Sequence, residues 1–427
     1  MRREDMLDSS PHRILHISAT DNLGGSGRSA YKIHSGLKRL GFDSKMIVRW
    51  KATTDADVMP IRTGAWKLAD KLASTAMDAL GLQYLYLPSS RRLLRQPWYR
   101  AADVVQLYNT HGNYFSHSVL PRMSLDKPIV WRLSDMWPMT GHCAYPGECT
   151  KWKTGCERCP ALDLFPRLKR DTTRFLWQHK QRLYSQCRLH LVAPSQWILD
   201  QARQSPLLSQ FPVSIIHNGI DGQTFRPQAR DDCRQRLHLA WTGPAILFLA
   251  DDVRDRRKGG NLFLEAVRRL WNTGTRDFLV MLVGAHAAEW DVDLPCPVWR
   301  QDAIRDDAKL SAVYGAADAL VHAAPQENLP NSVLEAMACG RPAVAFDAGG
   351  VAEVVKHLRT GYLAPVGDTA ALADGMAWIL SDERRWQTLA DNCRRLVSRE
   401  FSLAGQAEGF ARLYRQLLQD APQQAAA

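Results

Sequence analysis

The stretch QENLPNSVLEAMACGRPAVAFDAGG (Gln326–Gly350) is the most informative part of this 427-residue chain. It places two carboxylates eight positions apart, Glu327 in a predicted loop and Glu335 inside the helix that follows. Pro330 and Asn331 signal the start of that helix, where unpaired N–H groups and the positive end of the helix dipole can receive a phosphate. Carboxylates beside such a start can accept hydrogen bonds from sugar hydroxyls. The stretch therefore fits a sugar nucleotide.

A simpler interpretation of the same residues stays open at this point. Ser332-x-x-Glu335 also matches a capping box, in which Glu335 satisfies the first N–H groups of its own helix. Glu327 would then be an ordinary loop carboxylate in water. Spacing alone does not separate the two interpretations, since capping signals are common.

The whole run from Glu327 to Glu353 resembles the signature of the family 4 retaining glycosyltransferases. It reads Glu-x7-Glu, then Ala-Met-Ala-Cys-Gly-x-Pro-x-Val, then Gly-Gly-x-x-Glu. Ala193–Trp197 and Ile216–Pro227 resemble two further elements of that family, so the match covers most of residues 13–400. The resemblance is to members that assemble bacterial exopolysaccharide of the colanic-acid type or O-antigen. It implies the α/β GT-B fold, two doubly wound parallel-sheet, Rossmann-like domains facing a cleft.

Alternating strand and helix patterns predict the same α/β organisation directly. We expect an N-terminal, acceptor-side domain over residues 11–225 and a linker over 226–242. A nucleotide-sugar-binding domain is expected over 243–405, and a terminal helix over 406–420 that the resemblance returns to the first domain. The predicted strands are Ile14–Ser18, Lys45–Val48, Asp103–Leu107, Pro128–Leu133, Leu189–Ala193, Val213–Ile216, Ala245–Ala250, Phe278–Val283 and Ala319–His322.

Composition indicates an ordinary globular protein, with 45% hydrophobic and 23% charged residues. No run of about 18 apolar residues predicts a membrane span, and no apolar stretch behind the N-terminus predicts a signal peptide. We expect a cytoplasmic protein, whose nine cysteines are free or metal-bound rather than in disulfides.

The net charge of +11 is uneven, because residues 1–210 hold 31 Lys+Arg against 17 Asp+Glu. The positive charge of residues 1–210 suits an anionic partner; the alternative is an Arg-rich surface that only keeps the protein soluble. Gly64–Arg100 interleaves basic residues with aromatics, which favours the inner face of the cytoplasmic membrane over a packed insertion. No nucleic-acid fold is visible, so no nucleic-acid partner is expected.

The resemblance also assigns roles to individual residues. Glu327, His111 and Lys258 are the candidate catalytic residues, although a histidine after a strand is otherwise often a surface residue. The family's Gly-Arg dipeptide is replaced by Asp251–Asp252, so Arg254, Arg256 or Arg257 is left to supply the arginine; a solvated basic turn is the alternative. The candidate donor-binding residues are Glu335, Arg256, Arg257, Asn328, Leu329, Pro330, Asn331, Gly24 and Gly25.

Gly25-x-Gly27-x-x-Ala30 supports a rival hypothesis, a nicotinamide-dependent oxidoreductase with Asp43 as the ribose acid. The gap between the predicted strand and the glycines is long for that fingerprint. In the glycosyltransferase interpretation Gly24 and Gly25 form a loop whose backbone approaches the diphosphate or the acceptor.

Four cysteines, Cys143, Cys149, Cys156 and Cys159, lie within one Gly-, Pro- and Trp-rich segment, residues 135–160. The x2 spacing of the last pair suits a structural zinc, while the longer spacings also allow free thiols or a redox pair. Relatives often carry a histidine where this chain has Ser134.

The predicted function is retaining transfer of a hexose from a UDP- or GDP-sugar to a polyprenyl-diphosphate-linked oligosaccharide, in cell-surface polysaccharide biosynthesis. No cofactor is expected in catalysis, since Lys258, an arginine and the helix start can stabilise the leaving diphosphate. A non-catalytic GT-B binding or scaffold protein with a zinc loop is the alternative, favoured by the departures at Ser134 and Asp252.

Overall fold

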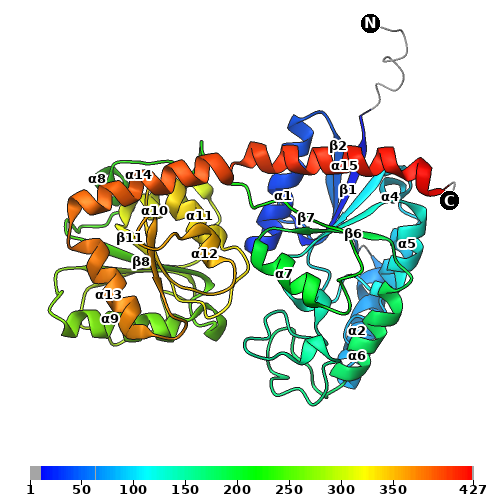
Figure 1. Cartoon of the computed structure of the whole chain (residues 1–427), viewed down its shortest axis with the longest axis horizontal. Coiled ribbons are helices and arrows are strands. Elements are labelled where there is room, and N and C mark those ends of the chain that lie inside the picture. Colours follow the sequence, from blue (N-terminus) through cyan, green and yellow to red (C-terminus); the bar gives the residue numbers. More distant parts are fainter. Residues whose placement is uncertain (1–10, 63, 426–427) are drawn as a thin grey trace, which may run out of the picture. The chain divides into compact units, whose positions relative to one another are not determined.

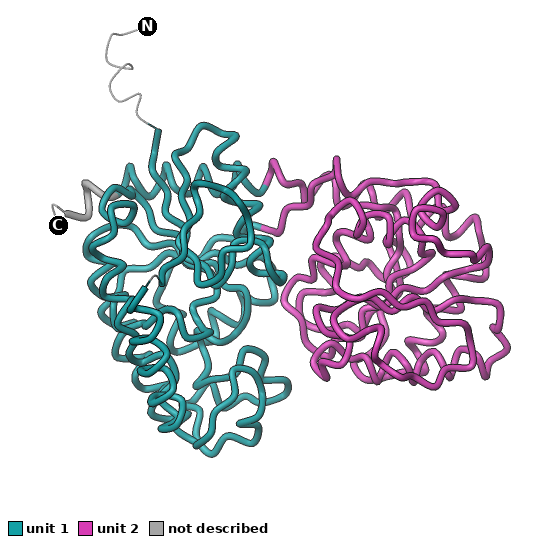
Figure 2. Tube along the Cα trace, turned by 180° about the vertical axis from the view of Figure 1, so that it is seen from behind, with its two compact units in different colours: residues 1–216, 406–427 teal, residues 217–405 magenta. Residues whose placement is uncertain are grey.

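The computed structural model describes residues 11–62 and 64–425, and the chain folds into two compact units. The first unit holds the described residues up to Ile216 together with those from Gln406 onward; the second runs from His217 to Gly405. Figure 2 distinguishes the two units by colour. None of the helices in the described ranges is long and apolar enough to cross a membrane.

The first unit contains a seven-stranded sheet in the order β3-β2-β1-β4-β5-β6-β7, in which every neighbouring pair is parallel. Its strands are β1 (Arg13–Thr20), β2 (Asp43–Trp50), β3 (Val58–Pro60), β4 (Val104–Leu107), β5 (Ile129–Arg132), β6 (Leu189–Ala193) and β7 (Val213–Ile215). Its helices are α1 (Gly24–Arg39), α2 (Ala65–Leu80), α3 (Pro88–Leu93), α4 (Pro97–Ala101), α5 (Leu120–Asp126), α6 (Thr173–Tyr184) and α7 (Gln196–Gln204), with short 3-10 turns at η1 (His117–Val119), η2 (Trp137–Met139) and η3 (Lys151–Lys153).

The second unit contains a six-stranded parallel sheet in the order β10-β9-β8-β11-β12-β13. Its strands are β8 (Ala245–Asp252), β9 (Leu279–Ala285), β10 (Val298–Gln301), β11 (Ala319–His322), β12 (Ala343–Phe346) and β13 (Gly361–Ala364). Its helices are α8 (Arg230–Arg236), α9 (Gly260–Asn272), α10 (Asp307–Ala316), α11 (Asn331–Ala338), α12 (Val351–Val354), α13 (Thr369–Leu380) and α14 (Glu383–Glu400), with the 3-10 turn η4 at Arg256–Lys258.

Both sheets are covered by helices on both faces, as Figure 1 shows for each unit. Along β8, Ala245 and Leu247 join the core cluster that contains α10 and α11, whereas Ile246 and Phe248 join the cluster that contains α9 and α13. Successive side chains of a strand point to opposite faces, so a strand buried on both sides needs a continuous apolar run. The two predicted doubly wound parallel sheets are therefore present, one in each unit.

The chain leaves the second unit through α15 (Leu403–Ala425), which begins at the unit boundary and packs on the first unit. Phe410 and Tyr414 are fully buried in its core, and the Tyr414 hydroxyl donates to Gln106 Oε1 at 2.8 Å. Residues 226–242, expected as a linker, instead belong to the second unit and carry α8, whose Cys233 is buried in the core. The sequence did not predict this helix because RDDCRQR has no apolar stripe, Cys233 being its one apolar residue.

Candidate active site

A buried carboxylate and two cations form the centre of the site in the second unit. Glu327 lies in the loop between β11 and α11 and is only 8% exposed. Its Oε2 is 2.9 Å from Lys258 Nζ and 3.6 Å from an Arg257 guanidinium nitrogen. Burial on its own would raise the pKa of Glu327, but the charges of Lys258 and Arg257 outweigh it and hold the pKa well below its usual range.

The two cations reach Glu327 because of a tight turn between β8 and α9. Asp255 Oδ1 accepts a hydrogen bond from the Arg257 backbone N–H at 2.9 Å, which shapes the 3-10 turn η4. Gly259 ends the turn at φ 74°, and a Cβ there would lie 1.8 Å from the Ala323 carbonyl oxygen. Only glycine fits at this position, so Gly259 is required by the backbone, while Lys258 before it supplies the charge.

The structure selects among the arginines that the sequence left open. Arg257 lies beside Glu327, whereas Arg254 points to Glu289 at 4.0 Å. The Arg256 side chain, a predicted donor contact, has no partner in the part of the chain that the structure describes. Asp252, which stands where relatives carry arginine, pairs with His286 at 3.1 Å.

The helix start beside Glu327 is α11, whose N-cap is Pro330 and whose first residue is Asn331. Ser332 therefore lies inside the helix, and the capping-box alternative is wrong. Asn218 holds the helix start, since its Nδ2 donates to Leu329 O at 3.1 Å and to Asn331 Oδ1 at 2.8 Å. The segment Asn218–Asp221 (Asn-Gly-Ile-Asp) thus contacts the segment from Glu327 to Glu335, and the sequence did not predict this contact.

Glu335 and the Gly349–Gly350 pair complete the surroundings of Glu327. Glu335, in the middle of α11, accepts a hydrogen bond from the Tyr314 hydroxyl at 3.1 Å. Gly349 has φ 63°, and a Cβ there would lie 1.8 Å from Glu327 O, while the Gly350 N–H donates to that same oxygen at 3.1 Å. The glycine pair is needed because its backbone supports the Glu327 loop directly.

His322 is a site residue that sequence reasoning missed. It ends β11, is buried, and its Nε2 has no hydrogen-bond partner among the described residues. Burial is the main reason that its pKa falls to about 4; the charge of Glu327 raises the pKa, and those of Lys258 and Arg257 lower it. The signal that could have found it is its position at the carboxyl end of a strand, where parallel sheets place ligands.

His322 predicts an acid sensitivity of the second unit. Between pH 6.5 and 4 the unfolded chain binds a proton on this histidine that the folded chain does not, so stability falls as the pH falls. We expect the loss to reach up to about 3 kcal/mol at the acid end. Urea unfolding at pH 7 and pH 4.5 should show a smaller pH dependence for His322→Gln than for the unaltered chain. An identical dependence in both proteins would contradict the assignment.

In the first unit, His111 and Asp135 form a buried pair at the carboxyl ends of β4 and β5. His111 Nε2 and Asp135 Oδ2 are 2.8 Å apart, and Asp135 Oδ1 accepts from the Trp137 backbone N–H at 2.9 Å. The His111 ring also makes edge contacts with Trp137 and Phe165 at centroid distances of 5.7 and 5.3 Å. His111 is therefore a held and oriented side chain, and the surface-residue alternative is wrong.

Gly24 and Gly25, expected in a loop, instead form the first turn of α1, with Gly24 at φ 64°. Gly27 packs against β1 so closely that a Cβ would lie 1.9 Å from Thr20 Oγ1. The loop before the helix is thus shorter than predicted. Gly27 is the glycine that the packing of α1 on β1 requires, whereas a Cβ at Gly24 would meet nothing within 4 Å. The start of α1 lies at the carboxyl end of β1, where parallel sheets place ligands.

The position of Asp43 contradicts the role of ribose acid that the oxidoreductase hypothesis gave it. Asp43 opens β2 and is in register with Arg13, the first residue of β1, whereas the glycines follow the last residue, Thr20. A ribose acid must lie at the carboxyl end of β2, next to the glycine turn. Asp43 instead lies at the amino ends of the strands, on the side of the sheet opposite to the glycines.

The cysteine loop lies beside this unit's core, with all four thiols partly buried and free. Burial first, and then the neighbouring thiols of Cys149, Cys156 and Cys159, raise the pKa of Cys143 to about 12. The Gly141 N–H lies 3.2 Å from Cys156 Sγ, and His142 Nε2 lies 3.3 Å from Cys159 Sγ. Over residues 11–62 and 64–425, no three His, Cys, Asp or Glu side chains converge closely enough to hold a metal ion.

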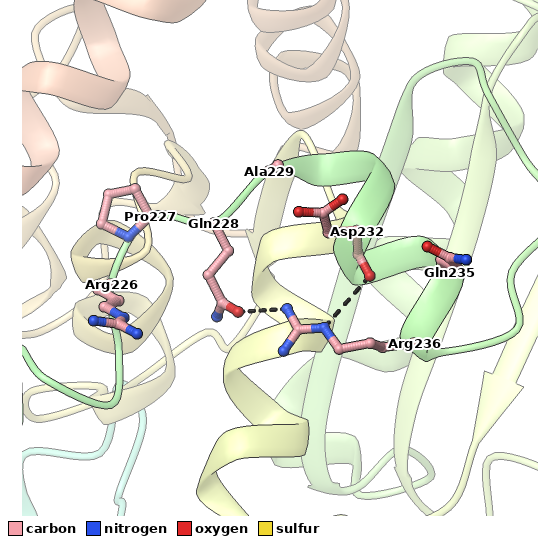
Figure 3. Close-up of a pocket in the computed structure, with 7 residues that line it drawn as sticks. All are labelled: Arg226, Pro227, Gln228, Ala229, Asp232, Gln235 and Arg236. Carbon is pink, nitrogen blue, oxygen red and sulfur yellow. Dashed lines mark hydrogen bonds between the residues drawn. The ribbon is translucent and has the colours of Figure 1, made fainter.

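A hollow on the second unit lies away from these residues. It is lined by one continuous stretch around α8, in which Arg236 bonds to Gln228 and to the Asp232 carbonyl oxygen (Figure 3). None of the predicted donor-binding residues lines it. We assign it no role in the site.

Comparison with solved structures shows the class of fold, which is GT-B. The chain is similar to sucrose-phosphate synthase from Thermosynechococcus elongatus, with a TM-score of 0.67 and 19% identity over 95% of this chain and 99% of that one. It is also similar to Anabaena Alr3699/HepE, solved in complex with UDP-glucose, with a TM-score of 0.66 and 16% identity over 95% and 99% of the two chains. The predicted fold class is confirmed.

Sequence comparison gives the family. The model described as Glycosyltransferase Family 4 matches residues 23–223, and the model described as Glycosyl transferases group 1 matches residues 243–382. The chain belongs to the family 4 glycosyltransferases, as its motifs predicted. It is 28% identical to the putative colanic acid biosynthesis glycosyl transferase WcaC of Escherichia coli K12 over 240 residues, 54% of this chain and 55% of that protein. The chain thus matches about half the length of this curated relative.

Proposed function

We propose that this protein transfers a hexose, with retention, from a UDP- or GDP-sugar to a hydroxyl of a polyprenyl-diphosphate-linked oligosaccharide during cell-surface polysaccharide biosynthesis. The observation that carries the proposal is the group formed by the buried Glu327 and the partly buried Lys258 and Arg257 beside the start of α11. Two cations and one carboxylate leave a net charge of +1, and the helix start adds partial positive charge. Such a site favours a diphosphate.

In the proposed reaction the bond between the anomeric carbon and the diphosphate oxygen breaks, and a bond from the acceptor oxygen to that carbon forms on the same face. The acceptor's proton passes to the departing diphosphate oxygen. Lys258, Arg257 and the N–H groups of α11 stabilise the charge that develops on the diphosphate, so no divalent cation is needed. Fixed donors in a partly buried site stabilise such charge without reorganising.

The carboxylates bind and orient the donor. Glu327 accepts hydrogen bonds from hydroxyls of the donor sugar, and Glu335 accepts from the ribose. Glu327 also keeps Lys258 in place before the donor arrives, because the two side chains are already hydrogen-bonded. For His111, whose ring is oriented by Asp135, we propose the catalytic role that the family resemblance implies.

The comparisons support this proposal in two ways. WcaC is named for colanic acid biosynthesis, which matches the polysaccharide that the motifs of this chain suggest. HepE was solved with UDP-glucose, so a protein of the same fold holds a nucleotide sugar. Neither comparison identifies the sugar, the base or the acceptor of this chain.

A donor panel tests the proposal. The purified full chain is heated alone and with UDP, GDP, their glucose and mannose conjugates, and a nicotinamide dinucleotide, and slow release of the nucleoside diphosphate is followed. We expect one base to raise the melting temperature and its sugar conjugate to be hydrolysed slowly. No shift and no hydrolysis with any donor would reject catalysis and favour the binding-protein alternative.

We also propose that Cys143, Cys149, Cys156 and Cys159 bind one structural zinc ion, which would have to draw the four thiols together, since no three of them converge on one point in the described residues. Elemental analysis of protein purified without chelator should find about one zinc per chain. The Cys156→Ser variant should lose the metal, and the first unit should melt earlier. Cys187→Ser, a partly buried thiol outside this loop, is the matched control. Zinc-free protein with an unchanged melting temperature would overturn the proposal.

A further inference from the structure

Helix α2 presents its apolar side to solvent. Only Asp70 and Ser74 are buried among its residues, whereas Leu68 and Leu72 are 61% and 64% exposed. These two leucines are four positions apart and lie on one face of the helix, which Ala76 continues. A surface helix normally turns such a stripe toward the core. The orientation of α2 therefore calls for something that covers the stripe.

A buried polar contact holds α2 in this orientation. Asp70 Oδ1 accepts a hydrogen bond from the Ser89 backbone N–H at 3.0 Å, and Asp70 Oδ2 accepts one from the Ser89 hydroxyl. Arg62 Nε lies 2.6 Å from the same Oδ2. Rolling the helix to bury its leucines would strip these partners from a carboxylate or leave Arg62 unpaired, and both are costly. The exposed stripe is thus a built feature of the first unit.

Basic side chains border the stripe. Lys67 and Lys71 precede the two leucines by one residue each, are exposed, and have no ion-pair partner within residues 11–62 and 64–425. On the neighbouring segment, the Arg91 and Arg92 guanidinium groups lie over the rings of Tyr86 and Trp66, each at 5.5 Å. Residues 64–100 hold four arginines and two lysines against two aspartates, of which Asp70 is already paired.

We propose that this face of α2, formed by Leu68 and Leu72 with Lys67 and Lys71, docks on the surface of an anionic phospholipid bilayer. The leucines enter the boundary between headgroups and acyl chains, and the lysines meet lipid phosphates. A single row of leucines with flanking cations suits a fluid surface, which needs no shape complementarity. A protein partner would need a broad, closely packed patch.

The carboxyl end of α2 is linked to the segment that carries His111, since Asn113 Nδ2 donates to Asp78 Oδ2 at 3.2 Å. Gln83, just beyond α2, donates to the Pro166 carbonyl oxygen at 3.2 Å, which ties the 160–172 loop to this end of the helix. In that loop Phe165 is 60% exposed and contacts the His111 ring. Docking through α2 would therefore bring the lipid surface close to a predicted catalytic side chain. This consequence rests on the proposed lipid-linked acceptor, whereas the docking itself does not.

Vesicle flotation with the full chain tests the inference. We expect binding to vesicles of phosphatidylcholine mixed with phosphatidylglycerol, weakened by salt, and little binding to phosphatidylcholine alone. Leu68→Ser with Leu72→Ser should weaken binding about tenfold or more, and Lys67→Gln with Lys71→Gln by a similar factor. Leu125→Ser, which alters a 67% exposed leucine on α5 of the same unit, is the matched control and should bind normally.

Other outcomes separate the alternatives. Unchanged binding in both double variants, or no binding to anionic vesicles, would overturn the inference. A concentration-dependent dimer in light scattering that the leucine variant abolishes would show that a second copy of the chain covers the stripe instead. Donor hydrolysis in solution should be unaltered in the leucine variant. If hydrolysis is absent while vesicle binding persists, the proposed function fails and the docking inference stands.

Discussion

Glu327→Gln is expected to lower kcat/KM for sugar transfer by about 100- to 1,000-fold, the loss typical of removing one preorganised polar group from an active site. Glutamine keeps the size of the side chain but removes the charge that orients Lys258 and accepts the donor's hydroxyls. The largest loss should appear in kcat, because we expect Glu327 to hold the sugar more strongly in the transition state than in the bound donor. Initial rates with the donor found in the panel measure it.

Two controls make this result interpretable. Glu289→Gln removes a carboxylate from the same unit whose side chain is 76% exposed, and it should leave transfer unchanged. Removing the Glu327 charge also leaves Lys258 and Arg257 facing one another, so a melting curve must show that the second unit is still folded. Full transfer activity in a folded Glu327→Gln protein would falsify the role given to this carboxylate.

Lys258→Met is expected to produce the second large loss, again of about 100-fold or more, with weaker inhibition by the nucleoside diphosphate product. The lysine is the closer of the two cations to Glu327, so it is the one expected to move onto the diphosphate. Product inhibition distinguishes this variant from Glu327→Gln, which should bind the free diphosphate at least as well as the unaltered protein.

Neighbouring arginines supply a graded control for the lysine. Arg256→Met removes the same charge from the same turn, but its side chain does not lie at Glu327, so its effect should be small. Arg257→Met should fall between the two. Combining Lys258→Met with Glu327→Gln should give less than the sum of the two single losses, because they act as one unit. Equal losses from Arg256 and Lys258 would mean that general charge, rather than position, determines donor binding.

Much of the fold could be predicted from sequence because central parallel strands are continuous apolar runs. Leu189–Ala193 and Ala319–His322 were predicted with the bounds that the structure has. The strands that were missed are short or lie toward the sheet edges, such as β3 at Val58–Pro60 and β10 at Val298–Gln301. Edge strands are buried on fewer sides, so their sequences carry a weaker apolar signal.

The sequence by itself determined the chemistry available to this protein: the paired glutamates, the Lys-Gly turn and the helix start are local patterns with local causes. Tertiary structure alone decided which arginine reaches Glu327, that His322 lies buried beside it, and that Asp43 is at the wrong edge of its sheet. It also decided that α2 turns its leucines outward, through the contact of Asp70 with Arg62 and Ser89. Each of these depends on partners distant in the chain or on the end of a strand, whereas local spacing reports only which residues share a face.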